Sequence, residues 1–180
     1  MRVTARTLVR AACLAAALVA ASGCSDEAAT PSTSSGLSVN ADTTGKTLPD
    51  VELLATTGDA VAVSSLLGQP LLVNFWYSTC EPCRREMPAL AEAHREFGDR
   101  VTFIGINMSD PAVVAQNFAD RYGVIFPILL DNGSVLTLGL GISIAPTTLF
   151  INSEGVIVEQ VSGELTAEDL TVRLNTLVSS

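Results

Sequence analysis

A run of apolar residues is followed, after two intervening residues, by a pair of cysteines at the start of a helical pattern. Residues 71–77 read LLVNFWY, which is typical of a strand buried on both faces of a sheet. The motif Cys80-Glu81-Pro82-Cys83 follows, and residues 81–97 have a helical pattern in which Pro88 should produce a kink. We therefore expect an α/β fold in which the cysteines stand where a buried strand passes into a helix.

The remaining chain alternates between strand and helix patterns. Two pairs of short strands flank turn residues at 56–59 and 152–155, as in β-hairpins. Asp110 is the expected N-cap of a helix that has Pro111 in its first turn. The order predicts a mixed central β-sheet flanked by helices, with an N-terminal β-hairpin extension. The expected strands are 51–54, 60–63, 71–77, 101–107, 128–130, 148–151 and 156–162, and the expected helices are 81–97, 111–122, 135–140 and 166–178.

The N-terminus carries the marks of a secretory signal. Three arginines precede an apolar stretch at 11–21, which is shorter than the ~20 residues that span a bilayer. This stretch accounts for part of the 48% of residues that are hydrophobic. Removing residues 1–23 takes away three arginines and no acid, so the formal charge of −9 becomes −12. Such an acidic surface disfavours binding to nucleic acid and to anionic lipid head groups.

The end of this signal resembles a bacterial lipobox, because residues 21–24 read ASGC. The resemblance implies that Cys24 becomes the N-terminus and carries a lipid that anchors the protein to the outer face of the cytoplasmic membrane. Ala21 stands where leucine is more usual, and ordinary secretion with a cut near the same place is the alternative. The Ser- and Thr-rich residues 24–45 are then expected to form a flexible tether, and residues 46–180 the folded domain.

The cysteine pair has three interpretations: zinc ligand, structural disulfide or redox centre. A structural zinc site needs four ligands, and beyond the signal only Cys24, Cys80, Cys83 and His94 are of the usual types. His94 itself reads as a partly exposed helix residue. A disulfide across two residues closes a very small loop and stabilises little. The redox interpretation is therefore favoured, with no metal and no cofactor beyond a redox-active Cys80–Cys83 disulfide.

The position of the motif predicts different roles for its two cysteines. A helix N-terminus favours a thiolate, so Cys80 is expected to be the exposed, attacking sulfur. Cys83 lies one turn inside the helix and is expected to be shielded and to resolve the mixed disulfide. Pro82 fits the first turn. Glu81 opposes thiolate formation, whereas the two arginines that follow Cys83 favour it.

These residues resemble the TlpA/ResA-like thiol:disulfide oxidoreductases of the thioredoxin superfamily. The resemblance covers about residues 46–180 and implies a thioredoxin-like fold. It rests on five segments in the same order: NFW at 74–76, CEPC at 80–83, RREMP at 84–88, YGVIFP at 122–127 and APTTLFI at 145–151.

The resemblance also implies roles for residues outside the motif. Pro146 matches a cis-proline beside the active disulfide, and the backbone at Ala145 would pair with an extended substrate segment. Glu86 matches a buried acid whose raised pKa suits proton transfer, and an exposed helix acid is the alternative. Trp76 matches an aromatic residue beside the disulfide, and a core tryptophan is an equally good account. Asn74 replaces the buried aspartate of thioredoxins and cannot titrate.

The implied function is extracytoplasmic thiol:disulfide exchange on protein substrates with cysteine pairs. Reduction of exported disulfides, such as those of apocytochrome c haem sites, is favoured over oxidation of secreted thiols. A reductant outside the cytoplasm needs a membrane electron donor, which the resemblance suggests is of the CcdA/DsbD type. We expect a monomer.

Three other functions are disfavoured. A peroxiredoxin needs Thr or Ser where this chain has Tyr77. A copper-delivery lipoprotein needs another cysteine spacing and a downstream histidine. A redox-inactive binding module has no need of these groups, so the presence of both cysteines and of the expected cis-proline disfavours it.

Overall fold

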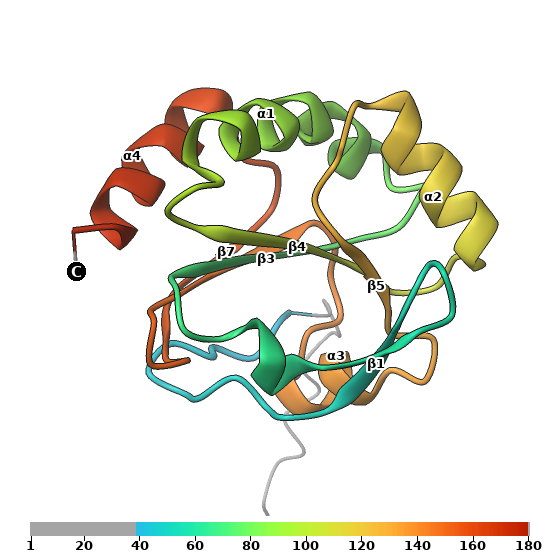
Figure 1. The fold of residues 1–180 in the computed structure, drawn as a ribbon, viewed down its shortest axis with the longest axis horizontal. Coiled ribbons are helices and arrows are strands. Elements are labelled where there is room, and N and C mark those ends of the chain that lie inside the picture. The colour runs from blue at the N-terminus through green and yellow to red at the C-terminus, as the bar shows by residue number, and fades with distance from the viewer. Residues whose placement is uncertain (1–38, 180) are drawn as a thin grey trace, which may run out of the picture. The chain divides into compact units, whose positions relative to one another are not determined.

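The computed structural model describes residues 39–179, and these form a seven-stranded mixed sheet with helices on both faces (Figure 1). The strands follow the order β2-β1-β5-β4-β3-β6-β7 across the sheet. Strands β3, β4 and β5 run parallel, whereas the other neighbours pair antiparallel. The expected mixed sheet and the N-terminal hairpin, β1 with β2, are confirmed. The strands are β1 Glu52–Ala55, β2 Ala60–Ala62, β3 Leu71–Trp76, β4 Thr102–Asn107, β5 Ile128–Leu130, β6 Thr147–Ile151 and β7 Ile157–Ser162.

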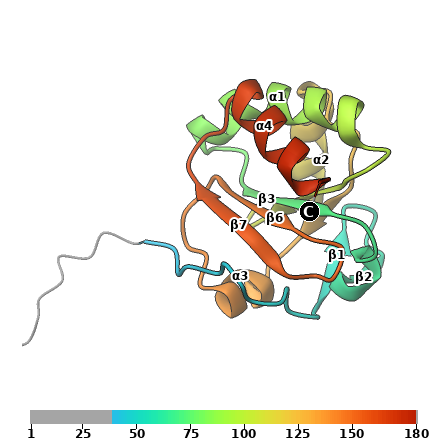
Figure 2. The same ribbon diagram turned by 90° about the vertical axis from the view of Figure 1, so that its left-hand side faces the viewer.

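The helices divide between the two faces of the sheet. Helices α1 (Glu81–Phe97), α2 (Ala112–Arg121) and α4 (Ala167–Leu177) cover one face, and the short α3 (Val135–Leu140) lies on the other (Figures 1 and 2). A single 3₁₀ turn, η1 (Val63–Leu66), follows β2. In the described part of the chain, no helix is long and apolar enough to cross a membrane.

Strand β3 builds both hydrophobic cores because its side chains alternate between the faces of the sheet. Leu72 and Trp76 join the cluster under α1, α2 and α4. Leu71, Val73 and Phe75 join the cluster on the side of α3. Every residue of β3 is buried, as the run of apolar residues predicted. The strand therefore holds the start of α1, and with it the cysteines, on a rigid support.

The last seven residues of the expected tether, 39–45, pack against the domain. The Asn40 side-chain oxygen accepts hydrogen bonds from the backbone N–H groups of Ser143, at 2.7 Å, and Ile144, at 2.9 Å. Thr43 is fully buried. The domain boundary expected at residue 46 is therefore placed too late. The signal at 1–23, Cys24 and the first part of the tether lie outside the described residues.

The start of α2 differs from the expected one. Asp110 does not cap the helix; Pro111 occupies the N-cap position without a side-chain hydrogen bond. The Asp110 carboxylate instead accepts hydrogen bonds from the backbone N–H and hydroxyl of Ser78, at 2.6 and 2.7 Å. Helix α1 continues as one element through Pro88.

Candidate active site

Cys80 and Cys83 form a disulfide at the N-terminus of α1. Their sulfur atoms lie 2.03 Å apart and their Cα atoms 5.3 Å apart. Cys80 is the N-cap residue, and its Sγ accepts a hydrogen bond from the Cys83 backbone N–H at 3.2 Å. The partial positive charge of a helix N-terminus stabilises a thiolate at this position once the disulfide is reduced. The expected placement of the motif is confirmed.

The exposure of the cysteines differs in part from the expectation. The exposed fraction is 4% for Cys80 and 0% for Cys83, so Cys83 is shielded as expected. Cys80 is the more accessible of the two, but the expectation of an openly exposed sulfur is wrong for this disulfide form. The partly buried side chains of Tyr77 and Ala145 pack against the large cluster that contains both cysteines.

Glu86 lies one helical turn after Cys83 and is buried, with an exposed fraction of 1%. One carboxyl oxygen accepts a hydrogen bond from the Asn74 amide at 2.7 Å, and the other accepts one from the Leu165 backbone N–H at 3.1 Å. Burial raises the pKa of Glu86 to about 7, although both hydrogen bonds favour the charged form and lower it. The alternative of an exposed helix acid is therefore wrong. A carboxyl with this pKa can exchange a proton near neutral pH.

The Ala145–Pro146 peptide bond is cis, as the resemblance implied. Pro146 precedes β6, is buried, and accepts a hydrogen bond at its carbonyl from the Gly163 N–H at 2.8 Å. Ala145 is half-buried and packs against the cluster that contains both cysteines. Its backbone N–H and C=O form no hydrogen bond within residues 39–179, so both groups are free to pair with an added segment.

Trp76 is a core residue. Its side chain has no exposed surface, and its ring stacks on Phe118 at 4.7 Å between centroids. A side chain buried to this extent does not contact a substrate, so the predicted substrate-binding role of Trp76 is wrong and the core alternative holds. The tryptophan belongs to the same buried cluster as both cysteines.

The charges around the motif offset one another. Glu81 lies 3.7 Å from the Arg84 guanidinium and 3.9 Å from that of Arg85. Arg85 also forms an ion pair with Glu164 at 2.7 Å. These side chains are largely exposed, where ion pairs contribute little energy. The helix N-terminus adds a further positive potential at the cysteines. Pro82 occupies the first turn of α1, as expected.

Asp110 is a site residue that the sequence did not reveal. Besides Ser78, two residues before Cys80, it binds the Asn107 side-chain amide at 2.8 Å. Its carboxylate thus ties the loop that carries Cys80 to the end of β4. No periodic pattern marks such a contact, because it joins polar residues 32 positions apart.

The part of the chain that the structure describes has no group of three or more His, Cys, Asp and Glu side chains arranged to hold a metal ion. His94 is half-buried, as predicted, and its ring contacts Phe103 and Phe126 edge-on. Burial lowers the pKa of His94. The redox group of the site is the disulfide itself.

Known proteins share this arrangement of sequence and fold. Residues 44–160 match the AhpC/TSA family. The thiol-disulfide oxidoreductase ResA of Bacillus subtilis is 34% identical over 123 residues, which are 68% of this chain and 69% of that protein. ResA of Halalkalibacterium halodurans is 37% identical over 112 residues, 62% of this chain and 64% of that protein. The solved structure of DsbF from MTB matches with a TM-score of 0.67 and 27% identity, over 73% of this chain and 99% of that one. The chain belongs to the AhpC/TSA family and, within the thioredoxin superfamily, to the ResA-like thiol-disulfide oxidoreductases.

Proposed function

We propose that this protein is an exported reductase of protein disulfides that works through Cys80 and Cys83. The observation that carries the proposal is the cysteine pair at the N-terminus of α1, one turn before the buried carboxyl of Glu86. The helix N-terminus activates one sulfur, and the carboxyl handles a proton at a pH near its pKa of about 7.

The first half of the reaction uses Cys80. Its thiolate attacks one sulfur of a substrate disulfide, a mixed disulfide forms, and the first substrate sulfur leaves as a thiolate. The free backbone groups of Ala145 pair with the substrate chain during this step, as in the addition of a strand.

The second half uses Cys83. Its thiol gives a proton to the Glu86 carboxylate, and the resulting thiolate attacks the Cys80 sulfur. The Cys80–Cys83 disulfide forms, and the second substrate sulfur leaves. Two electrons pass to the substrate, which leaves as a dithiol. Asn74 donates to Glu86 but cannot titrate, so Glu86 is the proton acceptor in this scheme.

The oxidised protein must then be reduced by another dithiol. We propose a membrane electron donor of the CcdA/DsbD type, because the medium outside the cytoplasm does not keep thiols reduced. Attachment through a lipid on Cys24 would keep the monomeric domain beside that donor at the outer face of the cytoplasmic membrane. Exported proteins with cysteine pairs, such as apocytochrome c with its haem-site cysteines, are the proposed substrates.

Trapping of the mixed disulfide tests the order of the two steps. The reduced full chain is mixed with a short peptide that contains an oxidised C-x-x-C-H segment. The Cys83→Ser protein should accumulate a peptide adduct on Cys80, which peptide mass mapping identifies. The wild type should release a reduced peptide. The Cys80→Ser protein should form no adduct at the motif.

An adduct on Cys83 in the Cys80→Ser variant, without one on Cys80 in the Cys83→Ser variant, would reverse the assigned roles. A wild-type protein that leaves the peptide oxidised would contradict the proposed function.

A further inference from the structure

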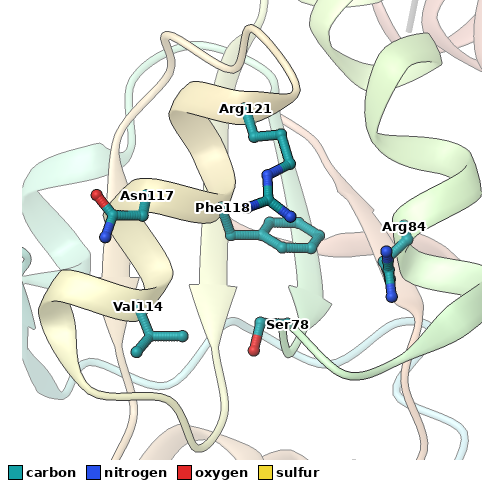
Figure 3. A pocket seen from close by; sticks show the side chains of 6 residues that line it. All are labelled: Ser78, Arg84, Val114, Asn117, Phe118 and Arg121. Carbon is teal, nitrogen blue, oxygen red and sulfur yellow. The ribbon is translucent and has the colours of Figure 1, made fainter.

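A pocket of about 280 Å³ opens beside the cysteine motif, between the loop that follows β3 and helix α2. The motif side contributes Ser78, two residues before Cys80, and Arg84, the residue after Cys83. Figure 3 shows these two side chains opposite those that α2 contributes. The lining residues are Ser78, Arg84, Val114, Asn117, Phe118 and Arg121.

The two arginines of this pocket retain free donors. The Arg121 side chain forms no ion pair or hydrogen bond with residues 39–179, and Figure 3 shows it extending from α2 toward the side on which Arg84 lies. Arg84 bonds the Tyr122 hydroxyl at 3.4 Å, and the nearest carboxylate oxygen, of Glu81, lies 3.7 Å away. Each of these contacts is at or beyond the limit of a hydrogen bond.

This arrangement differs from that of other arginines in the protein. Arg85, Arg95 and Arg173 each form a close ion pair with a glutamate. The whole chain has 19 acidic and 10 basic residues, so acids to neutralise Arg121 are plentiful in the sequence. Two incompletely paired guanidinium groups beside the motif therefore create a local positive site on an acidic protein.

The remaining lining defines the size and polarity of an occupant. Phe118 is buried and fixed between Trp76 and Tyr122, with ring centroids 4.7 Å from each, so it forms a rigid apolar floor. The Asn117 amide forms no hydrogen bond to the described residues and lies at the edge of the pocket. The volume lies at the lower end of the range for small-molecule sites, about 300–1,000 Å³, and is sufficient for one side chain.

Two carboxylates lie near the pocket and could oppose an anion: that of Glu81, 3.7 Å from Arg84, and that of Asp110. Asp110 accepts three hydrogen bonds, two from Ser78 and one from Asn107, so its charge is already bound by donors that face it. Asp110 is not among the residues that line the pocket. The charges that point into the cavity are those of Arg84 and Arg121.

We propose that this pocket binds the carboxylate side chain of an Asp or Glu residue close to the reacting cysteine of the substrate polypeptide. The short apolar stem of such a residue would lie on Phe118, and its carboxylate would accept hydrogen bonds from Arg84 and Arg121. The site lies beside Cys80, so the contact selects substrates with an acidic residue near the disulfide. This inference rests on the proposed function.

Two peptides that differ in one residue test the proposal. Both contain the same oxidised cysteine pair, and one has Glu where the other has Gln, adjacent to the first cysteine. The rate of reduction by the reduced full chain is measured at low ionic strength. The wild type should reduce the Glu peptide faster, by about threefold, the size expected for one partly exposed ion pair.

Variants at Arg121 locate the preference, because this residue lies on α2 and not in the cysteine motif. Arg121→Glu should slow reduction of the Glu peptide more than that of the Gln peptide, and so abolish or invert the preference, whereas Arg121→Lys should retain part of it. Arg100→Glu is the matched control, because it makes the same charge change at an exposed residue beyond the other end of α1.

Equal rates for the two peptides in the wild type would overturn the pocket proposal and leave the proposed function standing. An equal slowing of both peptides in Arg121→Glu would overturn it as well. If the wild type reduces neither peptide, the proposed function itself fails.

Discussion

The carboxyl of Glu86 and the amide of Asn74 meet at 2.7 Å between α1 and β3, in the interior of the protein. This contact places an ionisable group where charge is poorly solvated, and only one partner of the pair can titrate. Burial raises the pKa of Glu86 to about 7 although the hydrogen bond from Asn74 lowers it, so the site has a group that changes charge near neutral pH.

The Glu86→Gln variant should lose a pH dependence of stability. The unfolded chain releases the Glu86 proton near pH 4.5, whereas the folded protein holds it until about pH 7. The folded state therefore binds more protons in this window, and the wild-type free energy of unfolding should fall as pH rises from 4.5 to 7, by about 3 kcal/mol at ~1.4 kcal/mol per pKa unit. Urea unfolding at several pH values measures the slope, which Glu86→Gln should flatten.

Glu96→Gln is the control for this measurement. Glu96 is exposed on the same helix, so its replacement should leave the wild-type slope unchanged. A Glu86→Gln protein with the wild-type slope would show that Glu86 does not titrate in this window.

Gly105→Ala should disturb the packing of Trp76. A Cβ atom at residue 105 would lie 2.6 Å from the Ile128 side chain and 2.9 Å from the indole nitrogen of Trp76. Overpacking of this kind costs about 1–3 kcal/mol. Chemical unfolding should show the loss, and the fluorescence of the single tryptophan should change in the folded protein.

Gly139→Ala provides the comparison, because the nearest atom to its added Cβ is 3.8 Å away, an ordinary contact. This variant should be as stable as the wild type or more so, since alanine favours helix over glycine. Equal stability of the Gly105→Ala and Gly139→Ala proteins would contradict the packing argument at Trp76.

Asp110→Ala should loosen the loop that carries Cys80. The substitution leaves three donors without their acceptor, two on Ser78 and one on the buried Asn107. Unsatisfied buried groups cost about 1–3 kcal/mol, so we expect a loss of stability of that order and faster hydrogen exchange at the Ser78 amide.

Asp50→Ala is the matched control for the loop, because Asp50 accepts one exposed hydrogen bond, from the Ser64 N–H. Its effect on stability should be well below that of Asp110→Ala. Unchanged exchange at Ser78 in the Asp110→Ala protein would show that the carboxylate does not hold the loop.

The order and type of the elements could be predicted because the chain carries strong hydrophobic patterns. The fully buried β3 and the amphipathic α4 lie within two residues of their expected bounds. The cis bond before Pro146 and the burial of Glu86 could be predicted through family resemblance. Periodicity alone gives no information about either feature.

The features that could not be predicted are long-range contacts of polar residues. Asn40 lies in a Ser- and Thr-rich stretch whose composition indicates a tether, yet it binds a loop more than 100 positions away. Asp110 had the local context of an N-cap, and its bonds to Ser78 replace that role. The near-complete burial of Cys80 arises within a cluster whose residues come from distant parts of the chain, which no local pattern reveals.

The reduction potential of the Cys80–Cys83 pair tests the central claim most directly. Equilibration of the full chain with glutathione or dithiothreitol buffers at pH 7, followed by thiol trapping, measures it. A reductase of protein disulfides should have a potential near that of thioredoxin, about −270 mV. A potential near that of DsbA, about −120 mV, would contradict the account and identify the protein as an oxidase of secreted thiols.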